Sequence, residues 1–269
     1  MEMYWLNNIQ RNKLNKILTD NTSGSSGIVN LINTFLRGNV NHPEIIKDSI
    51  LILKTHLSHF AAVNTYLKRI KNIIKLDDQQ MMNDFLTSFA DSEKNQFEII
   101  FNKLNNKTKH INSVITLSKS GTLKEVFKLW KQKNKNLKVV ISESRLMNEG
   151  KLFAKELLNL GIKVELISDA MTALYVPKID AAIIGADEIL KNGNVINKVG
   201  SISLALLCKE NKKSFYVLTT KSKFSEHTKF SVKKADPSRL WNYKSKGLTV
   251  SNIYFEEIEN KLITKIITD

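Results

Sequence analysis

Several short polar segments in the second half of the chain contain side chains that could together bind a phosphorylated small molecule. Each follows a short apolar run, and they are residues 118–121, 142–145, 168–169, 185–188 and 219–223. Arginine and lysine hold phosphate oxygens through charge-assisted hydrogen bonds, and a carboxylate can bind hydroxyl groups or transfer a proton. Arg145 and Lys223 are therefore candidate phosphate-binding residues, and Asp187 is the candidate for hydroxyl binding or proton transfer. The alternatives are surface positions for the two cations and a helix cap for Asp187.

A sixth polar segment places Asn197 and Lys198 between Gly193 and Gly200. Glycines permit tight turns and close backbone approach to a ligand. The segment therefore suits contacts to a hydroxyl group and a phosphate group. The alternative is a turn followed by the solvated start of a helix.

The apolar runs before these polar segments predict the strands of a parallel sheet. Runs rich in β-branched residues at 114–116, 138–141, 164–167, 181–184 and 215–218 alternate with helical segments at 123–130, 150–160, from about 170, and 201–208. Such alternation with short connections is typical of a parallel sheet covered by helices on both faces. Ligands bind these folds at the carboxyl ends of the strands, near a change in strand order. The polar segments should therefore meet at one edge of the sheet.

The first part of the chain shows helical periodicity and almost no strand signal. Apolar residues repeat at helical spacing, as at Ile28, Leu31, Ile32 and Phe35, and residues 77–105 predict one long or one broken helix. Pro43 suits the first turn of a helix. We therefore expect an α/β protein with a helical N-terminal domain at residues 1–107 and a parallel-sheet domain at residues 108–269.

The chain is strongly basic. Its 269 residues include 41 Lys and Arg against 26 Asp and Glu, which gives a formal net charge of +15. A field of this sign attracts phosphorylated metabolites, nucleic acids and anionic membrane surfaces. The excess is spread along the chain, which favours a solvated lysine surface over a dedicated nucleic-acid face. Binding of RNA through the basic surface stays open as an alternative.

Residues that hold metals or form disulfides are scarce. Cys208 is the one cysteine, in an apolar helical run that indicates a buried thiol, and the five histidines show no metal-binding spacing. We expect neither a metal nor a cofactor. No apolar stretch approaches the roughly 18 residues of a membrane span, and the N-terminus has no basic and apolar leader. We therefore expect a cytoplasmic protein without membrane contact.

The order of motifs in the second half resembles one known family. Residues 141–145 are followed by Gly150-Lys151, Asp169-Ala170, Gly185-Ala186-Asp187 and Asn197-Lys198-Val199-Gly200. This order is similar to that in the family that groups the alpha, beta and delta regulatory subunits of translation initiation factor 2B with ribose 1,5-bisphosphate isomerase and methylthioribose 1-phosphate isomerase. The resemblance is strong over residues 111–224 and faint in the N-terminal half. There, Gly24, Ser25 and Ser26 resemble a glycine-containing substrate loop, with a helix-capping linker as the alternative.

The resemblance implies a helical N-terminal domain, a Rossmann-like C-terminal domain and dimerisation through the latter. In the isomerases, a cysteine after the first sheet strand and the aspartate of the Gly-Ala-Asp motif handle the protons. The matching positions are Ser118 and Asp187. A serine hydroxyl is a poor acid–base group unless a neighbouring base activates it, and Leu117 supplies none. The regulatory subunits tend to carry serine there, so Ser118 favours a regulatory protein, while Asp187 points partly toward the isomerases.

Two functional hypotheses follow from the resemblance. The first is a homodimeric, non-catalytic, initiation factor 2B-like regulatory protein that engages a translation initiation factor. It would bind a ribose phosphate or an AMP-like nucleotide through a set of predicted contacts: Arg145, Asn197, Lys198, Lys223, Gly24, Ser25 and Ser26. The second is an aldose–ketose isomerase of ribose 1,5-bisphosphate, with Asp187 as the main proton-transfer group and Ser118 as its partner.

Overall fold

The chain forms two compact units in a computed structural model that describes residues 6–20, 23–58, 60–145, 147–232 and 234–269. The N-terminal unit comprises Met1–Gln96 with Ser222–Phe224, and the C-terminal unit comprises Phe97–Lys221 with Ser225–Asp269. The predicted domain boundary between residues 107 and 108 stays a prediction. The first five residues, to which the prediction of no leader applies, lie outside the described residues. No helix in the described part of the chain is long and apolar enough to cross a membrane.

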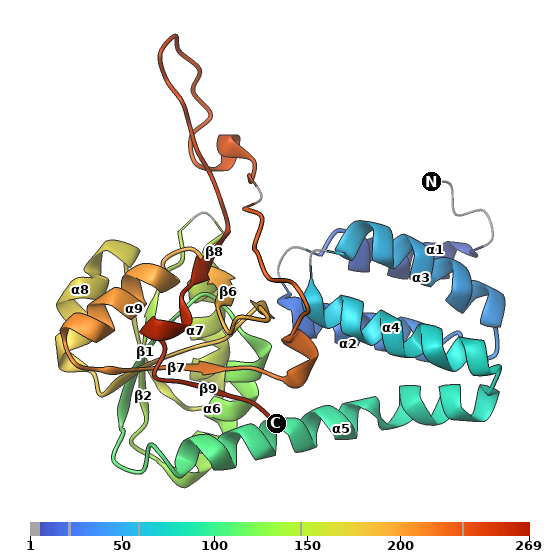
Figure 1. Cartoon of the computed structure of the whole chain (residues 1–269), viewed down its shortest axis with the longest axis horizontal. Coiled ribbons are helices and arrows are strands. Elements are labelled where there is room, and N and C mark those ends of the chain that lie inside the picture. Colours follow the sequence, from blue (N-terminus) through green and yellow to red (C-terminus); the bar gives the residue numbers. More distant parts are fainter. Residues whose placement is uncertain (1–5, 21–22, 59, 146, 233) are drawn as a thin grey trace. The chain divides into compact units, whose positions relative to one another are not determined.

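The N-terminal unit is helical, as predicted. Its helices are α1 (Asn8–Leu18), α2 (Ser25–Arg37), α3 (Pro43–Leu57), α4 (Ala61–Leu76) and the first part of α5 (Gln79–Asn105) (Figure 1). Their apolar faces pack into one core that includes Ile28, Leu53 and Ile70, all fully buried. Pro43 is the first residue of α3, where its missing N–H costs no intrahelical hydrogen bond.

Residues 79–105 form the single long helix α5, which was one of the two predicted alternatives. Met82 and Leu86 near its start pack in the N-terminal core. Ile100 and Leu104 near its end pack in a core of the C-terminal unit. The apolar residues of α5 therefore stabilise both units.

The C-terminal unit is built on a parallel sheet. Within the described residues this sheet has six strands in the order β3-β2-β1-β4-β7-β9, and every neighbouring pair is parallel. The strands are β1 (Ser113–Leu117), β2 (Lys138–Ser142), β3 (Lys163–Ile167), β4 (Ala181–Ile184), β7 (Ser214–Leu218) and β9 (Lys265–Ile267). This architecture confirms the predicted α/β fold class.

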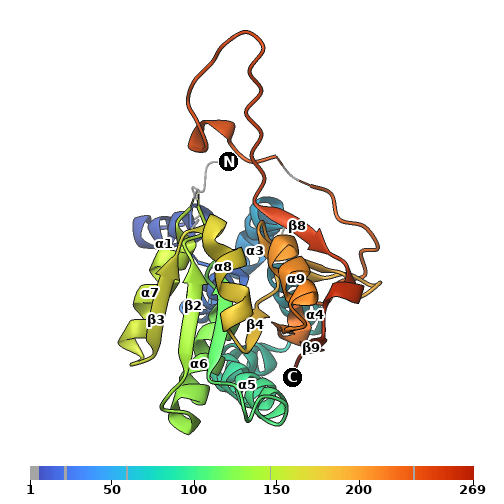
Figure 2. The same ribbon diagram turned by 90° about the vertical axis from the view of Figure 1, so that its left-hand side faces the viewer.

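Helices cover both faces of the parallel sheet (Figure 2). The helices α6 (Gly121–Lys133) and α7 (Glu149–Asn159) pack on one face through Phe127, Trp130 and Phe153. On the other face lie α8 (Thr172–Tyr175) and α9 (Ser201–Glu210). Leu204 of α9 packs in a separate apolar core on this face.

The helix predicted from about residue 170 is a short α-helix between two 3₁₀ turns. A 3₁₀ turn at Asp169–Met171 precedes α8, and another at Val176–Lys178 follows it. Pro177 has no N–H to donate to an α-helical turn. This explains why the regular helix ends at Tyr175.

A small antiparallel sheet lies beside the parallel one. It consists of β5 (Glu188–Ile189), β6 (Val195–Lys198) and β8 (Phe255–Ile258). Asn197 and Lys198 therefore end a strand, and the alternative prediction of a turn followed by a helix start is wrong for them.

The strand order reverses between β1 and β4, which is where ligands bind in open parallel sheets. Ser118 follows β1 and Gly185 follows β4. A Cβ atom at Gly185 would lie 2.6 Å from Ser120 Oγ, so a larger residue there would force Ser120 to shift. The fold thus brings the polar segments after β1 and β4 together.

Candidate functional site

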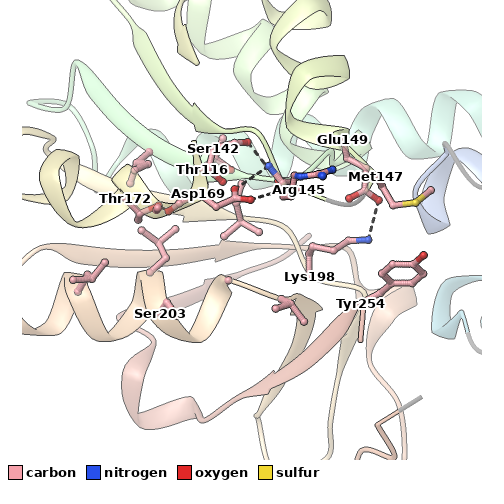
Figure 3. Close-up of a pocket in the computed structure, with 18 of the residues that line it drawn as sticks. Thr116, Ser142, Arg145, Met147, Glu149, Asp169, Thr172, Lys198, Ser203 and Tyr254 are labelled. Atoms are coloured by element: carbon pink, nitrogen blue, oxygen red, sulfur yellow. Dashed lines mark hydrogen bonds and ion pairs between the residues drawn. The ribbon is translucent and has the colours of Figure 1, made fainter. Parts of the chain in front are cut away.

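A pocket of about 410 Å³ opens at the carboxyl ends of β1 and β2 in the C-terminal unit (Figure 3). Its polar lining includes Arg145, Glu149, Asp169, Lys198 and Tyr254. Its apolar lining includes Ile115 and Leu117 from β1 and Leu204 and Leu207 from α9. A ligand here would meet charged groups on one side and aliphatic groups on the other.

Lys198 and Glu149 form an ion pair inside this pocket. Lys198 Nζ lies 2.8 Å from Glu149 Oε1, and each side chain is only 15% exposed. Lys198 Nζ also lies 5.1 Å from the ring centre of Tyr254 and 4.9 Å from that of Phe255. The ammonium group is therefore surrounded by one carboxylate and two aromatic faces, all of which stabilise its positive charge.

Ser118 lies next to the same carboxylate. Ser118 Oγ donates a hydrogen bond to Glu149 Oε2 at 3.2 Å, so Glu149 contacts both Ser118 and Lys198. Glu149 is the first residue of α7. The Glu149 carboxylate is therefore a basic group next to Ser118, whereas the neighbouring Leu117 supplies none.

Two serines at this edge of the sheet adopt left-handed backbone conformations. Ser118 has φ 59° and Ser144 has φ 54°, and Ser144 Oγ accepts a 2.6 Å hydrogen bond from the Ser118 backbone N–H. Such conformations are strained for residues other than glycine and cluster at functional sites. The hydrogen bond ties the ends of β1 and β2 together beside the pocket.

Asp169 fixes the backbone that carries Arg145. Its two carboxylate oxygens accept hydrogen bonds from the backbone N–H groups of Ser144 at 2.9 Å and Arg145 at 2.7 Å. The Arg145 guanidinium, in contrast, has no hydrogen bond or ion pair to any described residue. It is exposed and lines the pocket, so it is available to an anion.

The N-terminus of α9 is occupied by a carboxylate of the protein itself. Glu256 Oε1 accepts hydrogen bonds from the backbone N–H groups of Gly200 at 3.0 Å and Ile202 at 2.7 Å. Burial raises the pKa of the Glu256 carboxyl above its ordinary value, and the backbone hydrogen bonds partly offset this effect. A helix N-terminus commonly binds phosphate in such folds, but here Glu256 already fills that position.

The predicted site residues are distributed as follows. Arg145 and Lys198 line the pocket. Ser118 is not among the lining residues, but its hydroxyl is hydrogen-bonded to Glu149, which is. Asn197 is buried, and its Nδ2 donates to Ser201 Oγ at 2.9 Å. Asp187 is half-buried after β4, and its backbone N–H donates to Ile196 O at 2.8 Å.

The remaining predicted residues belong to the N-terminal unit. Gly24 is the N-cap of α2, and Ser25 and Ser26 begin that helix. Ser25 Oγ is buried and has no hydrogen-bond partner in the described part of the chain. Lys223 is buried in a 3₁₀ turn at Lys221–Lys223. None of these four residues is among those that line the pocket.

The comparisons with known proteins agree with the motif order. A family model described as "Initiation factor 2 subunit family" matches residues 45–269. The chain belongs to the initiation factor 2 subunit family. A translation initiation factor eIF-2B subunit 2-like protein of Pyrococcus abyssi is 37% identical over 159 residues, which cover 58% of this chain and 55% of that relative.

Relatives with a different name are almost as similar. The ribose 1,5-bisphosphate isomerase of Methanocaldococcus jannaschii is 31% identical over 170 residues, or 61% of this chain and 55% of that enzyme. The chain thus spans about half the length of the curated relatives it matches. The crystal structure of translation initiation factor eIF-2B from Pyrococcus horikoshii has a TM-score of 0.79 at 24% identity and covers 98% of this chain and 96% of that one, which shows the fold. The relatives therefore include proteins named as eIF-2B subunits and proteins named as sugar-phosphate isomerases.

Sequence reasoning missed Glu149 and Tyr254 as pocket residues, and it placed Asp169 in a polar segment at the sheet edge without assigning it a role. Glu149 directly precedes Gly150 of the family's motif order, and Asp169 is itself in that order. Both signals were therefore present in the sequence. Tyr254 lies more than fifty residues after Lys198 in the chain, and only the pairing of β6 with β8 brings it close.

Proposed function

We propose that the protein is an initiation factor 2B-like regulatory protein that binds a phosphorylated pentose or nucleotide in this pocket without isomerising it. The unpaired guanidinium of Arg145 at the pocket is the observation that carries the proposal. A guanidinium presents parallel N–H donors that match two phosphate oxygens. The pentose hydroxyls would contact the Glu149–Lys198 pair.

A hydroxyl at position 118 supports binding without turnover. Aldose–ketose isomerisation moves a proton between two carbons, which requires acid and base groups with suitable pKa values. The resemblance places a cysteine at position 118 in the isomerases, and this chain has serine. Asp187, Asn197, Lys223, Gly24, Ser25 and Ser26 stay predicted ligand contacts.

An isomerase is the second candidate, and one observation favours it. The Ser118 hydroxyl donates to the Glu149 carboxylate, so a base is present where the sequence suggested none. Glu149 could accept the serine proton while Asp187 moves the second proton. The chain would then be an aldose–ketose isomerase of a ribose phosphate.

The proposal extends to assembly and location. We infer a homodimer that engages a translation initiation factor in the cytoplasm, because relatives are named as eIF-2B subunits. Light scattering should give about twice the 30.7 kDa chain mass. A pull-down from lysate should recover protein partners that resist nuclease, whereas loss of all partners after nuclease treatment would support RNA binding instead.

Titration calorimetry with ribose 5-phosphate tests the binding site. Arg145→Ala should weaken binding about tenfold, because it removes a charge-assisted contact to phosphate. Lys151→Ala is the matched control, since Lys151 pairs with Glu143 and is not among the residues that line the pocket. Equal binding by wild type and Arg145→Ala would contradict the proposed site.

A further inference from the structure

We propose that Glu149 restricts the pocket to ligands with a single phosphate group, because it neutralises the second cation that a bisphosphate would need. The inference rests on the proposed function and specifies its ligand class. It assigns to Glu149 the role of a specificity-determining residue.

The positive charge of Lys198 is already matched. Its ammonium lies 2.8 Å from Glu149, with both side chains 15% exposed, and two aromatic rings cover it. An ion pair so poorly exposed to water is screened weakly by salt, so it persists at physiological ionic strength. A phosphate group could bind Lys198 only by displacing the carboxylate or by lying beside it.

Two further anion-binding positions around the pocket are also filled by carboxylates. Glu256 accepts the N–H groups of Gly200 and Ile202 at the start of α9. Asp169 accepts the N–H groups of Ser144 and Arg145. Neither set of backbone donors is left for a ligand phosphate.

Arg145 is therefore the one pocket-lining cation, among the described residues, whose charged group is not paired with a carboxylate. The fork of N–H donors of one guanidinium matches two oxygens of a single phosphate group. A second phosphate at the Lys198 end would face the negative charge of Glu149 at short range and in a poorly hydrated environment, where repulsion is strong.

The same carboxylate attracts hydroxyl groups. A carboxylate can accept about four hydrogen bonds, and Glu149 accepts one from Lys198 and one from Ser118. Its remaining lone pairs can accept ligand O–H groups. The ligand is thus oriented with its phosphate at Arg145 and its hydroxyl-bearing end at Glu149.

Calorimetric titration of ribose 5-phosphate and ribose 1,5-bisphosphate tests the proposal. The wild type should prefer the monophosphate, and Glu149→Gln should shift the affinity ratio about tenfold toward the bisphosphate, because Lys198 becomes available. The matched control is Glu143→Gln, which breaks the nearby ion pair between Glu143, before α7, and Lys151, in α7. Neither residue lines the pocket, so the ratio should stay unchanged.

Lys198→Gln provides a second variant that does not depend on how Glu149→Gln folds. It leaves the Glu149 carboxylate without its cation and should shift the ratio further toward the monophosphate. A wild-type preference for the bisphosphate, or a ratio that neither variant changes, would overturn the proposal while leaving the proposed function intact. Absence of binding of either sugar phosphate to the wild type and to both variants would overturn the proposed pentose phosphate binding as well.

Discussion

A Cβ atom at Gly150 would lie 1.9 Å from the carbonyl oxygen of Ser142. The second residue of α7 thus packs directly on the backbone at the end of β2. No side chain fits between them. This contact fixes the start of α7 and with it the position of Glu149 beside Lys198.

Gly150→Ala should therefore lower stability and ligand affinity together. Forcing a methyl group into this contact should cost about 1–3 kcal/mol of unfolding free energy, or more if the backbone does not shift. Thermal denaturation and calorimetry with ribose 5-phosphate measure the two effects, with Lys151→Ala as the neighbouring control. An alanine variant that melts and binds like the wild type would show that α7 is not held by this contact.

Asp169→Ala should weaken ligand binding by loosening the backbone of Ser144 and Arg145. We expect about a fivefold to tenfold loss of affinity for ribose 5-phosphate, since two charge-assisted hydrogen bonds are lost at an exposed site. Asp180→Ala is a matched control. Asp180 accepts the N–H groups of Asn112 and Ser113 at the opposite end of the sheet. Equal loss of affinity in both variants would indicate a general effect on folding.

Glu256→Gln should change the pH dependence of stability. Burial raises the pKa of Glu256 in the folded protein, so the fold favours the protonated form. The wild type should therefore lose unfolding free energy as pH rises from the ordinary glutamate pKa of about 4.3 through the raised folded value. Urea denaturation from pH 4.5 to 7.5 should show the glutamine variant gaining stability relative to wild type as pH increases. A relative loss with rising pH would refute this role of burial.

Cys208 should react very slowly with thiol reagents in the folded protein. It is fully buried in α9, and burial raises the pKa of its thiol to about 12. The thiolate is the reactive species, so reaction with Ellman's reagent at pH 8 should be at least about tenfold slower in buffer than in denaturant. A rate in buffer equal to that of an unfolded thiol would contradict the burial of this side chain.

The parallel sheet could be predicted from the sequence because the apolar runs that form its strands are local patterns. The runs at 114–116 and 181–184 are β-branched or small and apolar, and each ends at a polar segment. The break at Pro177 is a local signal too, but only the start of the helix, at about residue 170, was predicted from the sequence. The small sheet was not predicted, because β6 pairs with β8, which lies more than fifty residues further along the chain.

The site was predicted only in part, for a similar reason. Arg145 follows a predicted strand, and Lys198 lies between two glycines in the motif order, so local sequence signals identified both. The charge balance of the pocket depends on Glu149, Asp169 and Glu256, and their partners lie 24 to 56 residues away along the chain. Such pairings are set by tertiary packing rather than by local pattern.

Phosphorus NMR of the protein with ribose 1,5-bisphosphate and with ribose 5-phosphate tests the central claim most directly. Wild type should shift or broaden the ribose 5-phosphate signal, Arg145→Ala should not, and no ketose phosphate should form from either sugar. Appearance of the ribulose product with wild type, and its loss in Asp187→Asn, would contradict the regulatory proposal and establish the isomerase instead.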